Sequence, residues 1–191
     1  MIKQVTQYGE EVLRQVADIA IDNENNRKII QDLKDTLNEI PNGAGLAAPQ
    51  IGESVRIFAT RNYRDEKRDD ILIFVNPQII EESEQTIEIT DGCLSIPNVA
   101  GTTVRNSFIK VSYLNENFEV IEEELEGFQS VVFQHENDHL NGVLFIDRLG
   151  EGEAEKIDEM LEKKANGENL AYMGGKIVSI NIQASTIEGN E

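Results

Sequence analysis

The stretch QHENDHL, residues 134–140, contains both histidines of this 191-residue chain. His135 and His139 are four residues apart, so on a helix they lie one turn apart on the same face. Two imidazoles placed this way can share one metal ion, and the glutamate after the first can reach water as a general base. The stretch therefore predicts a metal site with Glu136 as its acid/base group.

The residues before this stretch predict that the site is buried inside the protein. We expect a helix from about Phe128 to Asn141, ended by Gly142 in a left-handed conformation. Its apolar positions recur at helical spacing, and the two histidines continue the same stripe. The stripe consists of Phe128, Val131, Val132, His135 and His139. Both imidazoles should point into the protein.

Two histidines leave a tetrahedral metal site short of one protein ligand. A histidine six residues after the second would complete one type of metalloprotease site, but Phe145 occupies that position. A downstream acid such as Glu159 is a second option. Cys93, the only cysteine, is a third, and it stands in the segment Asp-Gly-Cys-Leu-Ser at residues 91–95. The residues alone leave these options open.

A glycine-rich segment, GAGLAAPQIG at residues 43–52, begins like a dinucleotide-binding motif. That motif requires a strand before it and a helix after it. Here a predicted helix comes before it, and Pro49 opposes the helix that should follow. The segment is either a plain turn or a loop whose backbone approaches a ligand closely, which glycine permits.

The remaining patterns predict an α+β domain with antiparallel sheets around the histidine helix. A first amphipathic helix is expected from about Asn25 to Ile40. Strands are expected at residues 55–60, 71–75, 108–113 and 118–125. A C-terminal helix at 151–164 and a late strand at 176–184 extend this unit. We expect residues 1–191 to form one domain.

Composition excludes several classes of function. The chain has 36 acidic and 17 basic residues and a net charge of -19, which argues against binding nucleic acid or anionic membranes. No run approaches the ~20 apolar residues of a membrane span, and no signal peptide is recognisable. A single cysteine cannot form an internal disulfide. These features predict a soluble protein of a reducing compartment, which we expect to be the cytoplasm.

Together, the segments at 43–52, 91–95 and 134–140 resemble the three motifs of peptide deformylases, in the same order and with similar spacing. The early Val12-Leu13-Arg14 also resembles that family, and the resemblance covers a catalytic unit of about residues 8–149. It implies the family fold, with antiparallel sheets around the histidine helix. It also implies removal of the N-formyl group from formyl-methionine of nascent chains, close to the ribosome, with release of formate.

The resemblance also implies a role for individual residues. Cys93, His135 and His139 would hold one divalent metal, with Fe²⁺ expected and Zn²⁺, Ni²⁺ or Co²⁺ able to replace it. Glu136 would carry protons, and Gln50 and the backbone N–H of Leu94 would form the oxyanion hole. Gly45 and Gly92 would bind the peptide backbone. The methionine pocket would consist of Ala44, Ile89, Phe128, Val131 and Val132.

Some positions depart from the family pattern. Asp91 stands where the family usually has glutamate, and it is expected to pair with Arg105. Ala100 replaces a bulky residue, which should leave the cleft more open on that side. The helix at 151–164 is acidic, so we expect no docking on ribosomal RNA. The alternative functions are a zinc-dependent HExxH peptidase and a non-catalytic member that binds metal or peptide.

Overall fold

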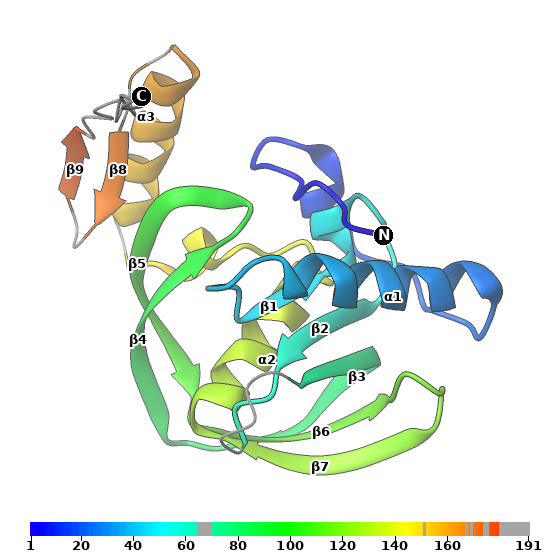
Figure 1. The fold of residues 1–191 in the computed structure, drawn as a ribbon. Helices are drawn as coiled ribbons and strands as arrows, with labels where there is room; N and C mark the ends of the chain where they lie inside the picture. Colours follow the sequence, from blue (N-terminus) through cyan, green and yellow to red (C-terminus); the bar gives the residue numbers. More distant parts are fainter. Residues whose placement is uncertain (65–69, 151, 167, 169, 174–175, 180–191) are drawn as a thin grey trace, which may run out of the picture.

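The computed structural model describes residues 1–64, 70–150, 152–166, 168, 170–173 and 176–179 (Figure 1). Within these residues, three α-helices and two sheets make up an α+β fold, as expected from the sequence. The helices are α1 (Glu24–Asn38), α2 (Gly127–His139) and α3 (Glu153–Ala165). Short 3-10 helices are η1 (Glu11–Arg14), η2 (Ala48–Ile51) and η3 (Phe145–Arg148).

The first sheet has five antiparallel strands in the order β1-β2-β3-β6-β7. These are β1 (Gly45–Ala47), β2 (Ile57–Arg61), β3 (Ile71–Glu82), β6 (Phe108–Leu114) and β7 (Val120–Glu126). The second sheet has the order β4-β5-β8-β9. Its strands are β4 (Thr86–Cys93), β5 (Ile96–Asn106), β8 (Leu170–Met173) and β9 (Lys176–Ser179). β4 and β5 form a long antiparallel hairpin, and β8 runs parallel to β5.

Helix α1 begins where Asn23 caps it, because the Asn23 side chain accepts a hydrogen bond from the N–H of Asn26 at 2.8 Å. Its buried face contacts β1 and β2 through Ile29, Leu33 and Leu37 among others. The helix predicted from the sequence ends two residues too late, at Ile40, because the regular helix ends at Asn38.

Helix α2 lies between the β4–β5 hairpin and the five-stranded sheet (Figure 1). Phe133 packs the helix against this sheet. The centroid of its ring lies 5.1 Å from that of Phe58 and 5.2 Å from that of Phe74. The chain turns beyond the helix at Gly142, which has φ +70° as expected. A Cβ at Gly142 would lie 2.5 Å from the carbonyl oxygen of Arg14, so only glycine fits there without a shift.

The strands agree with the sequence only in part. The four expected strands correspond to β2, β3, β6 and β7, with β3 extending seven residues further, to Glu82. The sequence analysis missed β1, β4, β5 and β8. Of the late strand expected at 176–184, residues 176–179 form β9 and the others lie outside the described residues. No helix in the described ranges is long and apolar enough to cross a membrane.

Candidate active site

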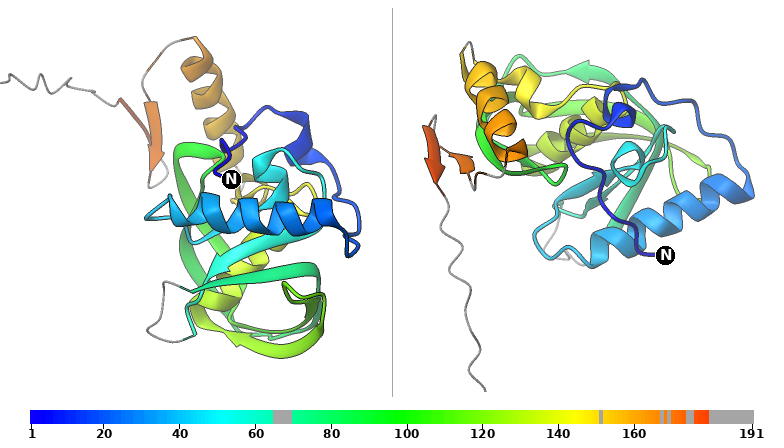
Figure 2. Two further views of the ribbon diagram at one scale, coloured as in Figure 1. Left: turned by 45° about the vertical axis from the view of Figure 1, so that its right-hand side comes forward. Right: turned by 90° about the horizontal axis from the view of Figure 1, so that it is seen from above.

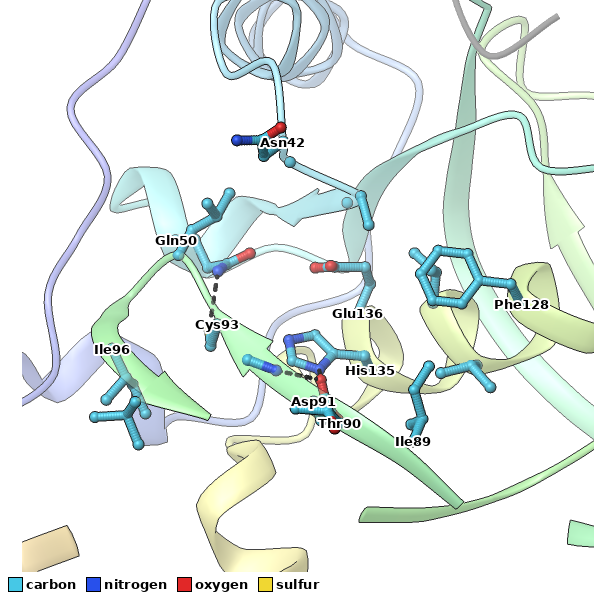
Figure 3. A pocket seen from close by; sticks show the side chains of 18 of the residues that line it. Asn42, Gln50, Ile89, Thr90, Asp91, Cys93, Ile96, Phe128, His135 and Glu136 are labelled. Atoms are coloured by element: carbon cyan, nitrogen blue, oxygen red, sulfur yellow. Dashed lines mark hydrogen bonds and ion pairs between the residues drawn. The ribbon is translucent and has the colours of Figure 1, made fainter. Parts of the chain in front are cut away.

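A cavity of about 350 Å³ opens between β4, β5, α2 and the segment that leads into β1 (Figure 3). Twelve of the thirteen residues that the sequence places in the site line this cavity. They are Ala44, Gly45, Gln50, Ile89, Gly92, Cys93, Leu94, Phe128, Val131, Val132, His135 and Glu136. The thirteenth, His139, is buried behind Cys93. Three sequence motifs, each separated from the next by 38 residues, therefore converge on one cavity.

Cys93, His135 and His139 each offer one ligand atom, and these atoms all lie within 4.8 Å of one another. The Sγ atom of Cys93 is 3.2 Å from Nε2 of His139. Glu159, the rival option for a third ligand, is not in this group, because it pairs with Lys163 on α3. The structure thus favours the cysteine among the options that the sequence left open.

His135 is oriented by Asp91. Its Nδ1 lies 2.9 Å from Oδ1 of Asp91, so an N–H at Nδ1 donates to the carboxylate and leaves Nε2 free to bind a metal. Oδ2 of Asp91 accepts from Arg105 at 2.9 Å and from the hydroxyl of Thr103 at 3.1 Å. The aspartate at this position is therefore long enough to reach both the histidine and the expected arginine.

Arg105 connects this aspartate to a second one on α2. Its other guanidinium nitrogen donates to Asp138 at 2.6 Å, and Asp138 also accepts from Arg148. Sequence reasoning did not assign Asp138, Arg148 or Thr103. The only signal for Asp138 was its position three residues after His135, which places it near the ligand face of the helix.

Gln50 is held in one orientation by its own hydrogen bonds. Its Oε1 accepts from the N–H of Ala47 at 2.8 Å, so its Nε2 must point the other way. That nitrogen lies 3.4 Å from Sγ of Cys93 (Figure 3). It also lies 3.2 Å from Oγ of Ser95. An amide N–H is thereby aimed at the ligand group, and the hydroxyl of Ser95 helps to hold it there.

Glu136 reaches the cavity from α2, and its side chain is 3% exposed. Among the described residues its Oε2 has no hydrogen-bond partner. Burial raises the pKa of this carboxyl to about 7, against the opposing pull of His135 and His139. A Cβ added to Gly45 would lie 2.4 Å from Oε1 of Glu136, so the glycine makes room for this carboxylate.

The electrostatics of the ligand group favour a thiolate. Burial opposes ionisation of Cys93, but the charge of His139 and hydrogen bonds from both imidazoles lower its pKa to about 5. For Asp91, burial likewise raises the pKa, but the hydrogen bond from His135 and the charge of Arg105 together lower it well below its usual range. Both anions are charged groups that a metal cation would stabilise further.

The apolar part of the cavity lies on the side of α2. Val131 and Val132 are buried, whereas Phe128 is 44% exposed at the rim, with its ring 4.7 Å from that of Tyr63. On the opposite side Val99 lines the cavity. The expectation that Ala100 borders the cleft is wrong, because its neighbour Val99 lines this cavity and Ala100 does not.

Comparisons with known proteins agree on one family. A sequence model described as polypeptide deformylase matches residues 2–155. A peptide deformylase of Fusobacterium nucleatum is 40% identical over 152 residues, covering 78% of this chain and 84% of that protein. One of Salinibacter ruber is 38% identical over 180 residues, covering 88% and 91%.

Solved structures show the same fold. The peptide deformylase of Thermotoga maritima matches with a TM-score of 0.72 and 39% identity over 78% of this chain and 99% of that one. The peptide deformylase of Legionella pneumophila matches with a TM-score of 0.77 and 32% identity, covering 87% of this chain and 96% of that one. A Met-Ala-Ser-bound class I type b peptide deformylase of Acinetobacter baumannii matches with a TM-score of 0.71 and 30% identity, covering 78% of this chain and 99% of that one. The chain belongs to the peptide deformylase family, the metal-dependent enzymes that remove N-formyl groups from nascent peptides.

Proposed function

We propose that Cys93, His135 and His139 hold one divalent metal, beside which Glu136 carries the protons of deformylation. The observation that supports this most directly is a buried glutamate beside three converging ligand atoms, with one oxygen that has no partner in the described part of the chain. Pure metal binding would require neither this glutamate nor the fixed amide of Gln50.

The residues present fit a metal. One thiolate and two imidazoles are a common donor set, and the three ligand atoms lie within 4.8 Å of one another. When bound, the metal supplies Lewis acidity, which polarises a carbonyl and lowers the pKa of water toward ~7. We propose Fe²⁺ as the native ion, with Zn²⁺, Ni²⁺ or Co²⁺ as active substitutes. Metal analysis after anaerobic purification tests this choice.

Glu136 does the proton transfer. Its carboxylate accepts a proton from the water that attacks the formyl carbon and then donates it to the departing amine, giving formate and a free N-terminus. A pKa near 7 suits both directions of transfer at neutral pH. Nε2 of Gln50 and the backbone N–H of Leu94 donate to the formyl oxygen as it becomes negative.

Substrate position follows from the two sides of the cavity. We propose that the methionine side chain enters between Ile89 on β4 and Val131 on α2, in a pocket completed by Ala44, Phe128 and Val132. The peptide backbone passes Gly45 and Gly92. A Cβ at Gly92 would lie 3.4 Å from the carbonyl oxygen of Val99, so a side chain there would narrow this path.

Several wider features remain proposals. We propose that residues 1–191 form one domain, which is supported by a core cluster shared by Leu13, Cys93 and the C-terminal Ile157 and Tyr172. We place the enzyme in the cytoplasm, acting on nascent chains near the ribosome without a nucleic-acid contact of its own. The charge of -19 supports the last point.

The test is formate release from formyl-Met-Ala-Ser, the formylated form of the peptide bound in the Acinetobacter baumannii relative. Acetyl-Met-Ala-Ser and the unmodified peptide are the controls. Glu136→Gln should keep its metal, and its kcat should fall about 10²–10⁴-fold, because the amide cannot accept the proton. Cleavage of the internal peptide bonds would indicate an HExxH peptidase, and binding without formate release would indicate a non-catalytic member.

A further inference from the structure

The edge of the cavity formed by residues 97–99 of β5, here called the cavity lip, does not pair with the neighbouring strand β4. In the β4–β5 ladder Cys93 pairs with Ile96, while the next pair joins Gly92 to Ala100. Residues 97–99 of β5 therefore bulge out of the ladder without a partner on β4. Asn98 and Val99 of this bulge line the cavity.

Asn98 has an unusual backbone within the bulge. Its φ is +66°, a left-handed conformation that costs most side chains energy and that asparagine tolerates better than most. It is also exposed, so a ligand in the cavity can reach it. A residue in this conformation persists where its surroundings hold it in place.

The C-terminal extension (α3, β8 and β9) supplies that support. The ammonium of Lys164 on α3 donates to the carbonyl of Pro97 at 3.1 Å, and Val99 pairs with Tyr172 on β8. These two ties flank Asn98 on either side. Figures 1 and 2 show the extension beside this end of β5.

The pairing of Val99 with Tyr172 is stabilised by the packing of Tyr172. The Tyr172 ring is fully buried and its hydroxyl donates to Glu153 of α3 at 3.0 Å. Val99 and Tyr172 share a core cluster with Ile96 of β5 and Met160 of α3. The family model ends at residue 155, before almost all of this extension. The family model therefore does not describe the contact of this extension with residues 97–99.

We propose that the C-terminal extension holds Asn98 in position to hydrogen-bond the substrate backbone beyond formyl-methionine. This rests on the proposed function, which assigns the methionine side chain to the Phe128 end of the cavity. Ile96, at the start of the bulge, lies at the opposite end from Phe128, with Cys93 and Glu136 between them (Figure 3). A carboxamide can both donate to and accept from a peptide unit, so Asn98 suits a backbone of any sequence.

The experiment compares formyl-Met-Ala-Ser with N-formylmethioninamide, which has no residue beyond methionine. The readout is the ratio of KM for the amide to KM for the tripeptide. Asn98→Gly keeps the left-handed backbone and removes the side chain. It should lower this ratio about three- to tenfold, the loss expected for one hydrogen bond.

Tyr172→Ala removes the support and should lower the ratio to a similar degree. The double variant with Asn98→Gly should lose no more than either single variant, because both act through the same contact. Tyr172→Phe, which keeps the ring, should retain the wild-type ratio. Ile30→Ala, on the buried face of α1, controls for general destabilisation. If Tyr172→Ala does not fold, Lys164→Met tests the other tie and should also lower the ratio.

An unchanged ratio in Asn98→Gly overturns the proposal. Additive effects in the double variant, or equal losses on both substrates in Tyr172→Ala, also overturn it, because they indicate a merely structural extension. Failure of the proposed function looks different, since the wild-type protein would then release no formate from either substrate.

Discussion

At the residue scale, the position of Glu136 depends on the absence of a side chain at Gly45. The Cβ of an alanine there would lie 2.4 Å from Oε1 and 2.7 Å from Cδ of the glutamate. One of the two residues must then move. Gly45 thus makes room for the proposed proton carrier, in addition to its proposed contact with the peptide backbone.

Gly45→Ala should lower kcat by about 10² or more, within the range expected when a general base is displaced. Metal content should stay near the wild-type level, because the ligand group is not touched. Steady-state kinetics and elemental analysis measure the two effects. Gly150→Ala is the matched control, since a Cβ at Gly150 meets nothing within 4 Å. Full activity of Gly45→Ala would show that Glu136 tolerates displacement.

Cys93→Ala should lower metal affinity more than Asp91→Asn does. Removing a ligand deletes a bond to the metal, whereas the asparagine only weakens the support of His135 and should cost roughly 10–100-fold. Elemental analysis after dialysis against a chelator series measures both. Equal affinities in Cys93→Ala and the wild-type protein would remove the cysteine from the ligand set.

At the scale of elements, Arg105 connects the β4–β5 hairpin to helix α2. It is 2% exposed and donates to Asp91 on β4 and to Asp138 on α2. Hydrogen bonds between Gln134 on α2 and Asn106 on β5 join the same two elements. The hairpin that carries Cys93 is thereby aligned with the helix that carries the histidines.

Arg105→Met should lower the free energy of unfolding by about 3–5 kcal/mol, because it leaves buried carboxylates without their countercharge. Arg148 still neutralises part of the charge on Asp138, which favours the lower end of this range. Urea denaturation measures the change. Arg27→Met, which breaks an exposed pair with Asp22, is the control and should cost less than ~1 kcal/mol. Equal losses in both variants would contradict a buried role for Arg105.

At the scale of the whole molecule, the negative charge extends onto the surface of α3. This helix carries five acids and three bases, namely Glu153, Glu155, Asp158, Glu159 and Glu162 against Lys156, Lys163 and Lys164. Two of the bases are engaged, Lys163 with Glu159 and Lys164 with the carbonyl of Pro97. The helix therefore offers RNA phosphates little positive charge.

We expect that removal of residues 151–191 will not change co-sedimentation with ribosomes at any salt concentration. Phosphate contacts give binding that weakens steeply with salt, and an acidic helix makes few of them. Sedimentation across a salt series, with the full chain beside the truncated one, measures this. Salt-sensitive binding that disappears on truncation would contradict the prediction.

The expectations from sequence succeeded best where structure is local. Helices α1, α2 and α3 were predicted within two residues at each end, because their apolar positions repeat at helical spacing. The β4–β5 hairpin was missed. β5 contains Pro97, Gly101 and four threonine or asparagine positions, a composition that does not resemble a regular strand. Its bulge and pairing with β8 depend on contacts that no local pattern records.

The sequence by itself determined the pair His135 and His139 and the glutamate beside them, because helical periodicity fixes which residues share a face. The tertiary structure decided that Cys93, 46 residues from His139, lies in one group with both histidines. It likewise decided that Asp91 orients His135, that Gly45 makes room for Glu136, and that Val99 rather than Ala100 lines the cavity. These relations depend on strand register and on packing between elements, and one residue of register shift would reverse them.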